Sequence, residues 1–246
     1  MLLPYKLIKC ITMNKYILTI ALAVLTSCAS IDDKDSIPNY KKAVIDESIY
    51  TELDQLYLKE NISGVFEKFQ SISNPNTLLS ASYWLRDISK KSGDSRYMYL
   101  YATTLLRLLD IKNIDSESKE EFKETAVLVY YLARLTLLID GIKCKDQTID
   151  FGTIMRDMEI KIDAKIFAIY NAFPQEQKKH VESLVLKTEE QIKNIRTQKW
   201  ICQKSISYLT DKKKLQYVSD KEYQEWRLKL RRNFLNIFHL IVYKKP

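Results

Sequence analysis

Apolar residues recur every three or four positions along most of the chain from residue 40 onward, the spacing of one face of an α-helix. Only 4 Gly and 5 Pro occur among the 246 residues, too few for the frequent turns of a many-stranded β protein. We therefore expect an all-α fold over residues 40–246: a single irregular helical bundle or array of about eight helices, including αα-hairpins. The expected helices cover residues 40–57, 63–72, 77–91, 97–109, 118–139, 151–173, 174–202 and 219–241.

Local signals predict where several of these helices begin and end. Asn39 can cap the first helix, and the Asn-Pro-Asn sequence of residues 74–76 separates the second from the third. Gly93 with the aspartate after it predicts the tight turn of an αα-hairpin. Ser118 and Ser219 each stand three residues before a glutamate, which is the spacing of a capping box at a helix start.

The most hydrophobic of the expected helices contains residues 126–139, in which only Arg134 and Thr136 are polar. A helix that is apolar on nearly every side is buried on nearly every side. Its 14 residues are fewer than the ~20 that a membrane span needs. We expect the central core helix here, ending at Asp140-Gly141.

A further apolar run lies near the N-terminus, at residues 16–25. Its length suits the hydrophobic region of a secretory signal peptide rather than a membrane span of ~20 residues. The run leads into Leu25-Thr26-Ser27-Cys28, which resembles the lipobox of bacterial lipoproteins. The resemblance implies that residues 1–27 are a signal peptide, with Met13 an alternative start, and that Cys28 is lipidated and becomes the N-terminus. The alternative is a buried N-terminal helix that happens to end in cysteine.

The lipobox resemblance carries expectations about location. Two or three acyl chains anchor a protein firmly to a membrane. Residues 28–39 would form the lipidated cysteine and a polar tether, of which ten random-coil residues span ~17 Å. An aspartate after the cysteine resembles an inner-membrane retention signal in diderm bacteria, so Ala29 favours the outer membrane, facing the periplasm. In a cell with one membrane, the protein would be anchored to it on the extracytoplasmic side.

Two cysteines, Cys144 and Cys202, remain in the mature chain once Cys10 is removed and Cys28 is lipidated. An even number of cysteines in an oxidising compartment favours a disulfide. This bridge would pin the loop after the core helix to the apolar stripe of the helix that we expect to reach Cys202. The alternative is one buried and one exposed thiol. Two cysteines are too few for a structural zinc site.

The charge balance is basic, with 39 Lys+Arg against 31 Asp+Glu and a formal charge of +8. Loss of residues 1–27 removes three lysines and no acid, which leaves 36 basic and 31 acidic residues and a charge of +5. Export argues against the nucleic-acid partner that a basic protein otherwise suggests. We expect two partners, the lipid membrane through Cys28 and a protein of the cell envelope, and the sequence leaves the oligomeric state open.

No common catalytic, phosphate-binding or metal motif occurs: the chain has no G-x-x-x-x-G-K-[ST], G-x-G-x-x-G, G-x-S-x-G or H-E-x-x-H. Glu176 and His180 are four residues apart and could share a helix face as metal ligands do, but a solvated pair explains them as well. His239 lies among apolar residues and is expected to pack or cap within the last helix. We expect no cofactor and no metal.

Two carboxylates, Glu159 and Asp163, would share one face of the expected helix over 151–173. A pair of carboxylates can perform acid–base chemistry. Lys161 and Lys165 lie between and after them, so ordinary ion pairing along the helix explains the pattern better.

Two further clusters could form interaction surfaces. A tyrosine cluster could pack in the core or, because tyrosine is enriched at binding hot spots, could line a docking surface. A basic stretch in the last helix could be a solvated face or could lie on a membrane. These clusters are Tyr97, Tyr99 and Tyr101, and Arg227, Lys229, Arg231 and Arg232.

Together these features favour a non-enzymatic lipoprotein: a membrane-anchored, disulfide-pinned helical module that binds or assembles other envelope proteins. One alternative is an envelope enzyme, such as a hydrolase of cell-wall polymer, whose carboxylates meet only in three dimensions. A deep pocket that gathers two or more carboxylates would distinguish it. A second alternative is an exclusion or defence factor that acts on incoming DNA or protein at the membrane.

Overall fold

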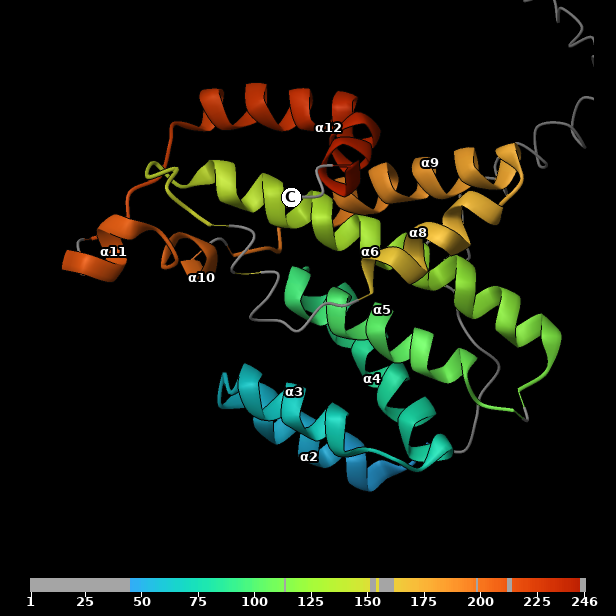
Figure 1. The fold of residues 1–246 in the computed structure, drawn as a ribbon. Helices are drawn as coiled ribbons and strands as arrows, with labels where there is room; N and C mark the ends of the chain where they lie inside the picture. The colour runs from blue at the N-terminus through green and yellow to red at the C-terminus, as the bar shows by residue number, and fades with distance from the viewer. Residues whose placement is uncertain are drawn as a thin grey trace, which may run out of the picture. The chain divides into compact units, whose positions relative to one another are not determined.

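The computed structural model describes residues 45–112, 114–150, 154, 162–197, 199–211 and 214–243. The expected signal peptide over residues 1–27 with the alternative start Met13, the expected lipidated Cys28 and tether over 28–39, and the expected cap Asn39 lie outside the described residues. Within those residues the fold contains ten α-helices and no β-strand, which confirms the all-α prediction (Figure 1). The helices are α2 (Glu47–Leu58), α3 (Ile62–Ser71), α4 (Pro75–Ser92), α5 (Ser95–Leu109), α6 (Ser116–Lys143), α8 (Asp163–Ala172), α9 (Gln175–Ile192), α10 (Lys199–Cys202), α11 (Ile206–Asp211) and α12 (Asp220–Tyr243).

The long helix α6 is the centre of the fold. It contacts α5, α8, α9, α10 and α12, while α4 packs on the outer side of α5 and α2 packs on α3 and α4 (Figure 1). In the described part of the chain, α6 alone is long and apolar enough to cross a membrane, yet 89% of its most apolar 18-residue window is buried inside the protein. The prediction of a central core helix is therefore confirmed. The predicted length is wrong, because α6 has 28 residues and continues past Asp140-Gly141 to Lys143.

The predicted αα-hairpin is formed by α4 and α5. Asn74 accepts hydrogen bonds from the first backbone N–H groups of α4, which therefore begins at Pro75 rather than at the predicted residue 77. Gly93 ends α4 in the left-handed conformation, with φ 63°, and its N–H donates to the carbonyl of Ser89 at 2.9 Å. Asp94 then caps α5 by accepting from the N–H of Arg96 at 2.9 Å. The turn therefore follows from local chemistry that the sequence displays.

Several helix boundaries differ from the predicted ones. The first described helix begins at Glu47, because Asp46 accepts a hydrogen bond from the N–H of Ser48 and caps it there. Asp115 rather than Ser118 caps α6, because the Asp115 carboxylate accepts from the Ser118 N–H at 2.8 Å. The second predicted capping residue is confirmed, since Ser219 Oγ accepts from the N–H of Glu222 at 3.2 Å.

Two helices predicted to be continuous are interrupted. The helix expected over 151–173 is not helical at Ile162, and α8 begins at the next residue; residues 151–153 and 155–161 lie outside the described part. The helix expected to reach Cys202 ends at Ile192, after which Ile195 is half-exposed. Cys202 lies instead in the separate short helix α10, which contacts α6.

Candidate partner-binding cavity beside the disulfide

The structure contains the predicted disulfide between Cys144 and Cys202, whose Cα atoms are 5.3 Å apart. Both cysteines are buried. Cys144 directly follows the last residue of α6, and Cys202 is the last residue of α10. The bridge therefore fixes α10, and the chain that continues into α11, to the end of the central helix.

The segment after α6 also pairs with the segment that leads into α12. The N–H of Lys145 donates to the carbonyl of Gln216 at 2.9 Å, and the N–H of Val218 donates to the carbonyl of Lys143 at 3.0 Å. These bonds form an isolated antiparallel β-bridge between Cys144 and Tyr217. The start of α12 is thus held at a fixed position relative to the end of α6.

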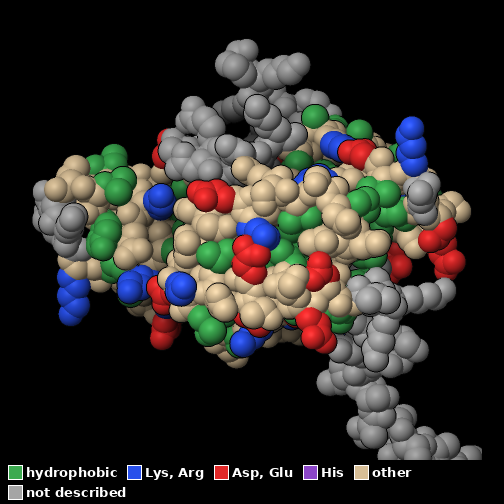
Figure 2. All heavy atoms as spheres, turned by 90° about the horizontal axis from the view of Figure 1, so that it is seen from below, with side chains coloured by type: hydrophobic (Ala, Val, Ile, Leu, Met, Phe, Trp, Pro, Cys, Tyr) green, Lys and Arg blue, Asp and Glu red, His purple; other side chains and the backbone are tan. Residues whose placement is uncertain are grey.

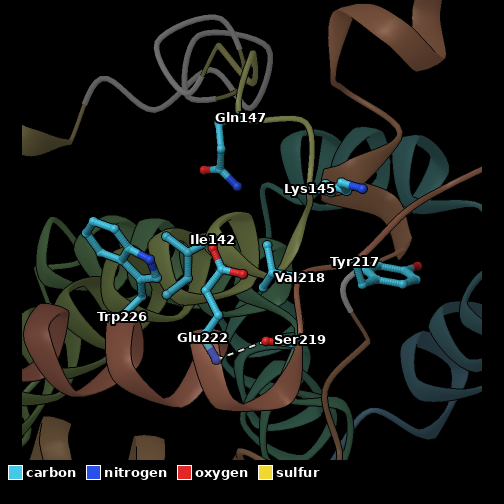
Figure 3. A pocket seen from close by; sticks show the side chains of 8 residues that line it. All are labelled: Ile142, Lys145, Gln147, Tyr217, Val218, Ser219, Glu222 and Trp226. Atoms are coloured by element: carbon cyan, nitrogen blue, oxygen red, sulfur yellow. Dashed lines mark hydrogen bonds between the residues drawn. The ribbon is translucent and has the colours of Figure 1, made fainter.

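A cavity of about 560 Å³ opens beside this β-bridge. Its apolar residues Ile142 and Val218 lie near the middle in Figure 3, with Trp226 of α12 on one side and Tyr217 on the other. Trp226 is 49% exposed and Tyr217 is 44% exposed. The remaining lining residues are polar: Lys145, Gln147, Ser219 and Glu222. We call this site the aromatic cavity.

The side chains of the aromatic cavity suit a protein or peptide ligand. Half-exposed Trp and Tyr beside an apolar floor are the residues that dominate binding energy at protein interfaces. A lysine and a glutamate in the lining can pair with opposite charges on a partner. In Figure 3 the carboxylate of Glu222 lies toward Ile142, between the Trp226 ring and Val218.

A second cavity of about 310 Å³ lies next to the disulfide and is lined by Lys145, Asp146 and Lys214 among others. Asp146 accepts hydrogen bonds from the Ser207 N–H at 3.0 Å and the Thr148 N–H at 2.9 Å. Hydrogen bonds from Ser207 and Thr148 hold the pKa of this carboxyl well below its usual range. Each of the two cavities has one carboxylate in its lining, so neither gathers the pair that a polymer hydrolase would need.

The basic stretch of α12 is not a continuous solvated face, and both sequence interpretations of it are wrong for Arg227 and Arg231. Arg227 donates to both carboxylate oxygens of the fully buried Glu189 of α9, at 3.1 and 2.6 Å. Arg231 and Arg196 also pair with Glu189. Burial alone would lower the pKa of Arg227, but its hydrogen bonds to Glu189 and Glu190 raise it. Arg227 and Arg231 thus join α12 to α9 through one carboxylate, which Arg196 also contacts.

The remaining basic residues of that stretch, Lys229 and Arg232, are exposed. The ammonium of Lys229 lies 4.5 Å from the centre of the Trp226 ring, which places a positive charge at the edge of the aromatic cavity. The side chain of His239 lies outside the described residues.

The carboxylate pair considered in the sequence is not assembled by the described residues. Glu159 lies outside them, and Asp163 accepts from the hydroxyl of Tyr130 at 2.6 Å and pairs with Arg134 of α6 at 3.1 Å. Lys165 pairs with Asp110 rather than along its own helix. The predicted ion pairing within the helix is therefore replaced, for Asp163 and Lys165, by pairing with other helices.

The tyrosines considered for a docking surface lie in the core instead. Tyr97, Tyr99 and Tyr101 of α5 are all buried, at 5% exposure or less. Tyr99 packs edge-on against Tyr130 of α6, with ring centres 5.8 Å apart. Burial raises the pKa of Tyr99. The alternating tyrosines point to different neighbouring helices, and the core interpretation is confirmed for all three.

Glu176 and His180, the pair considered as metal ligands, are both exposed to solvent. The Nε2 atom of His180 lies 3.9 Å from the carboxylate of Glu124 rather than from Glu176. In the residues that the structure describes, no group of three or more His, Cys, Asp or Glu side chains could hold a metal ion.

Sequence reasoning missed the aromatic cavity. Helical spacing places Trp226 on the same face as the apolar residues Tyr223 and Leu230, whereas the structure buries Arg227 at that face and exposes Trp226. The signal that could have indicated this was Arg227 itself, four residues after Tyr223 and therefore on the same side of the helix.

Comparison of the chain with protein-family models, with curated proteins and with solved structures gave no match.

Proposed function

We propose that the protein is a bacterial lipoprotein, anchored to a membrane through Cys28, whose helical domain binds another protein of the cell envelope. In a diderm cell the anchor would lie in the outer membrane, with the domain facing the periplasm. In a cell with one membrane, the domain would face the exterior. The role is that of an interaction or assembly module.

Two features support a location outside the cytoplasm. The lipobox-like residues 25–28 follow an apolar run that is too short for a membrane span. The disulfide between Cys144 and Cys202 supports the same location, because such bonds persist in oxidising compartments and are rare in the cytosol. A tether of residues 28–39 would keep the domain close to the membrane.

The single observation that carries the interaction role is the aromatic cavity. Trp226 and Tyr217 leave about half of their side chains in water, although a tryptophan is costly to expose and is usually buried. The disulfide and the β-bridge fix the backbone on which Tyr217 lies, so little conformational entropy would be lost on binding. A preorganised apolar site with charges at its edge is typical of a protein-binding hot spot.

Crosslinking in intact cells tests this role. The wild-type protein should capture a specific envelope protein, and Trp226→Ala should weaken the capture by about 30-fold, as expected for a hot spot of about 2 kcal/mol. Leu228→Ala is the matched control, because Leu228 is equally exposed on the same helix but does not line the cavity.

Equal capture by the wild type, Trp226→Ala and Leu228→Ala would contradict a partner-binding role for the cavity. Recovery of no specific envelope protein would contradict the proposed function itself. If the captured molecule belongs to an incoming phage or plasmid system instead, the exclusion factor becomes the better interpretation.

A further inference from the structure

The short helix α11 exposes two large aliphatic side chains to water. Ile206 is 57% exposed and Leu209 is 63% exposed. Three residues apart, they lie on neighbouring positions of one helix face. Figure 2 shows hydrophobic side chains gathered at the end of the domain that holds α10 and α11 in Figure 1, with Lys and Arg side chains beside them. Such an exposed apolar group needs a partner or a function.

Lysines lie close to α11. Lys204 stands two residues before Ile206, and Lys145 and Lys214 line the 310 Å³ cavity, to which Ser207 of α11 also contributes. All three lysines are exposed. The one carboxylate in that cavity, Asp146, already accepts backbone hydrogen bonds from Ser207 and Thr148, and the two lysines of the lining outnumber it. The cavity therefore suits an anionic group.

The position of α11 is fixed from two sides. The disulfide holds Cys202, which stands four residues before the first residue of α11. The first residues of α11 are held by the loop after α6: the N–H of Ile206 donates to Thr148 Oγ1 at 2.9 Å, and the N–H of Ser207 donates to Asp146 at 3.0 Å. The apolar side chains of α11 are therefore presented by a preformed element.

We propose that α11 and the lysines around it dock on a membrane surface that contains anionic phospholipid. Ile206 and Leu209 enter the headgroup region, and Lys145, Lys204 and Lys214 contact lipid phosphates. Apolar side chains flanked by lysines are the combination by which peripheral proteins bind such surfaces. The inference rests on the proposed membrane anchoring, which places the domain beside a membrane, and it would orient the aromatic cavity relative to that membrane.

Vesicle flotation tests the docking without the lipid anchor. The full chain carrying Cys28→Ala is mixed with vesicles of phosphatidylcholine alone, or of phosphatidylcholine with phosphatidylglycerol. The apolar run at residues 16–25 is the same in every variant, so differences between variants report on the domain. Binding that depends on the lysines should appear only with the vesicles that contain phosphatidylglycerol, and it should weaken as salt is added.

Ile206→Asp combined with Leu209→Asp should lower partition into the anionic vesicles by at least about tenfold. Lys214→Gln should lower it by about fivefold. The matched controls are Leu58→Asp, at an exposed leucine of α2, and Lys59→Gln beside it; both should leave partition unchanged. Far-ultraviolet circular dichroism and thiol alkylation confirm that each variant is folded and keeps its disulfide.

The proposal is overturned if the α11 double variant partitions as Leu58→Asp does, or if anionic and neutral vesicles bind equally. It is also overturned if the double variant binds vesicles normally and instead loses the crosslinked partner, because α11 is then a protein-binding element. None of these outcomes bears on lipidation of Cys28 or on the Trp226 test, so the two proposals fail separately.

Discussion

Replacing Glu189 by glutamine removes a negative charge from the most enclosed ionic cluster among the described residues. The side chain of Glu189 has no exposure to water, and three arginines point at its carboxylate: Arg196 at 3.0 Å, Arg227 at 2.6 Å, and Arg231. Glu189→Gln keeps the shape of the side chain but leaves these buried cations without their shared counter-charge.

The size of the effect follows from which partners remain. Breaking a buried ion pair by removing one member costs about 3–5 kcal/mol, because the other charge is left uncompensated. Arg227 would keep Glu190 at 2.6 Å, and Arg196 would keep Asp140 at 3.6 Å. The loss should therefore fall near the lower limit, about 3 kcal/mol, which is a large part of the 5–15 kcal/mol by which domains are usually stable.

Urea unfolding followed by circular dichroism measures this loss. The matched control is Glu190→Gln, one residue along the same helix, whose carboxylate is 44% exposed and should contribute about 1 kcal/mol or less. Equal destabilisation by the two variants, or a loss below 1 kcal/mol for Glu189→Gln, would refute the view that the cluster holds α12 to α9.

Three further predictions concern other parts of the fold. Removing the disulfide with Cys144→Ser and Cys202→Ser should cost about 4 kcal/mol of unfolding free energy, the value that the chain-entropy model gives for a loop of 58 residues. A wild-type protein whose urea midpoint is the same under reducing and oxidising conditions would contradict this prediction. Hydrogen bonds from Lys193 and then Arg227 lower the pKa of Glu190 from 4.5 to about 2, so its contribution to stability is present above pH 4.5 and is lost as the pH falls toward 2. Glu190→Gln should flatten the dependence of the unfolding free energy on pH in that window. A curve that superimposes on that of the wild type would disprove the effect. Gly93→Ala should destabilise the protein by about 1–2 kcal/mol, because φ is 63° there and the new Cβ would lie 2.6 Å from Cγ of Arg196. Thermal unfolding measures this loss, and an unchanged stability would show that the turn relaxes.

Local chemistry made much of the fold predictable. The helical spacing of apolar residues, the turn at Gly93 and the cap at Ser219 act within a few residues of sequence, and each was confirmed. The disulfide was predictable because only two of the four cysteines lie outside the N-terminal segment that resembles a lipoprotein signal peptide.

The pairing between distant helices could not be predicted in the same way. Glu189 follows Val185 by four residues and lies on the buried side of α9, where a carboxylate needs a partner. Nothing local identifies Arg227 and Arg231, about 40 residues later, as that partner. The exposure of Trp226 follows from the same pairing, because burying Arg227 turns the tryptophan toward water. The aromatic cavity is thus a consequence of how α12 docks on α9 and α6.

The most direct test of the account is whether Cys28 carries lipid. Cells grown with a fatty-acid analogue should label the wild-type protein and the Cys10→Ala control, and the label should be lost in Cys28→Ala, whose product should also retain its N-terminal segment. A Cys28→Ala variant that still takes up the label, or a native protein that is unlabelled and intact from its initiator methionine, would contradict the account.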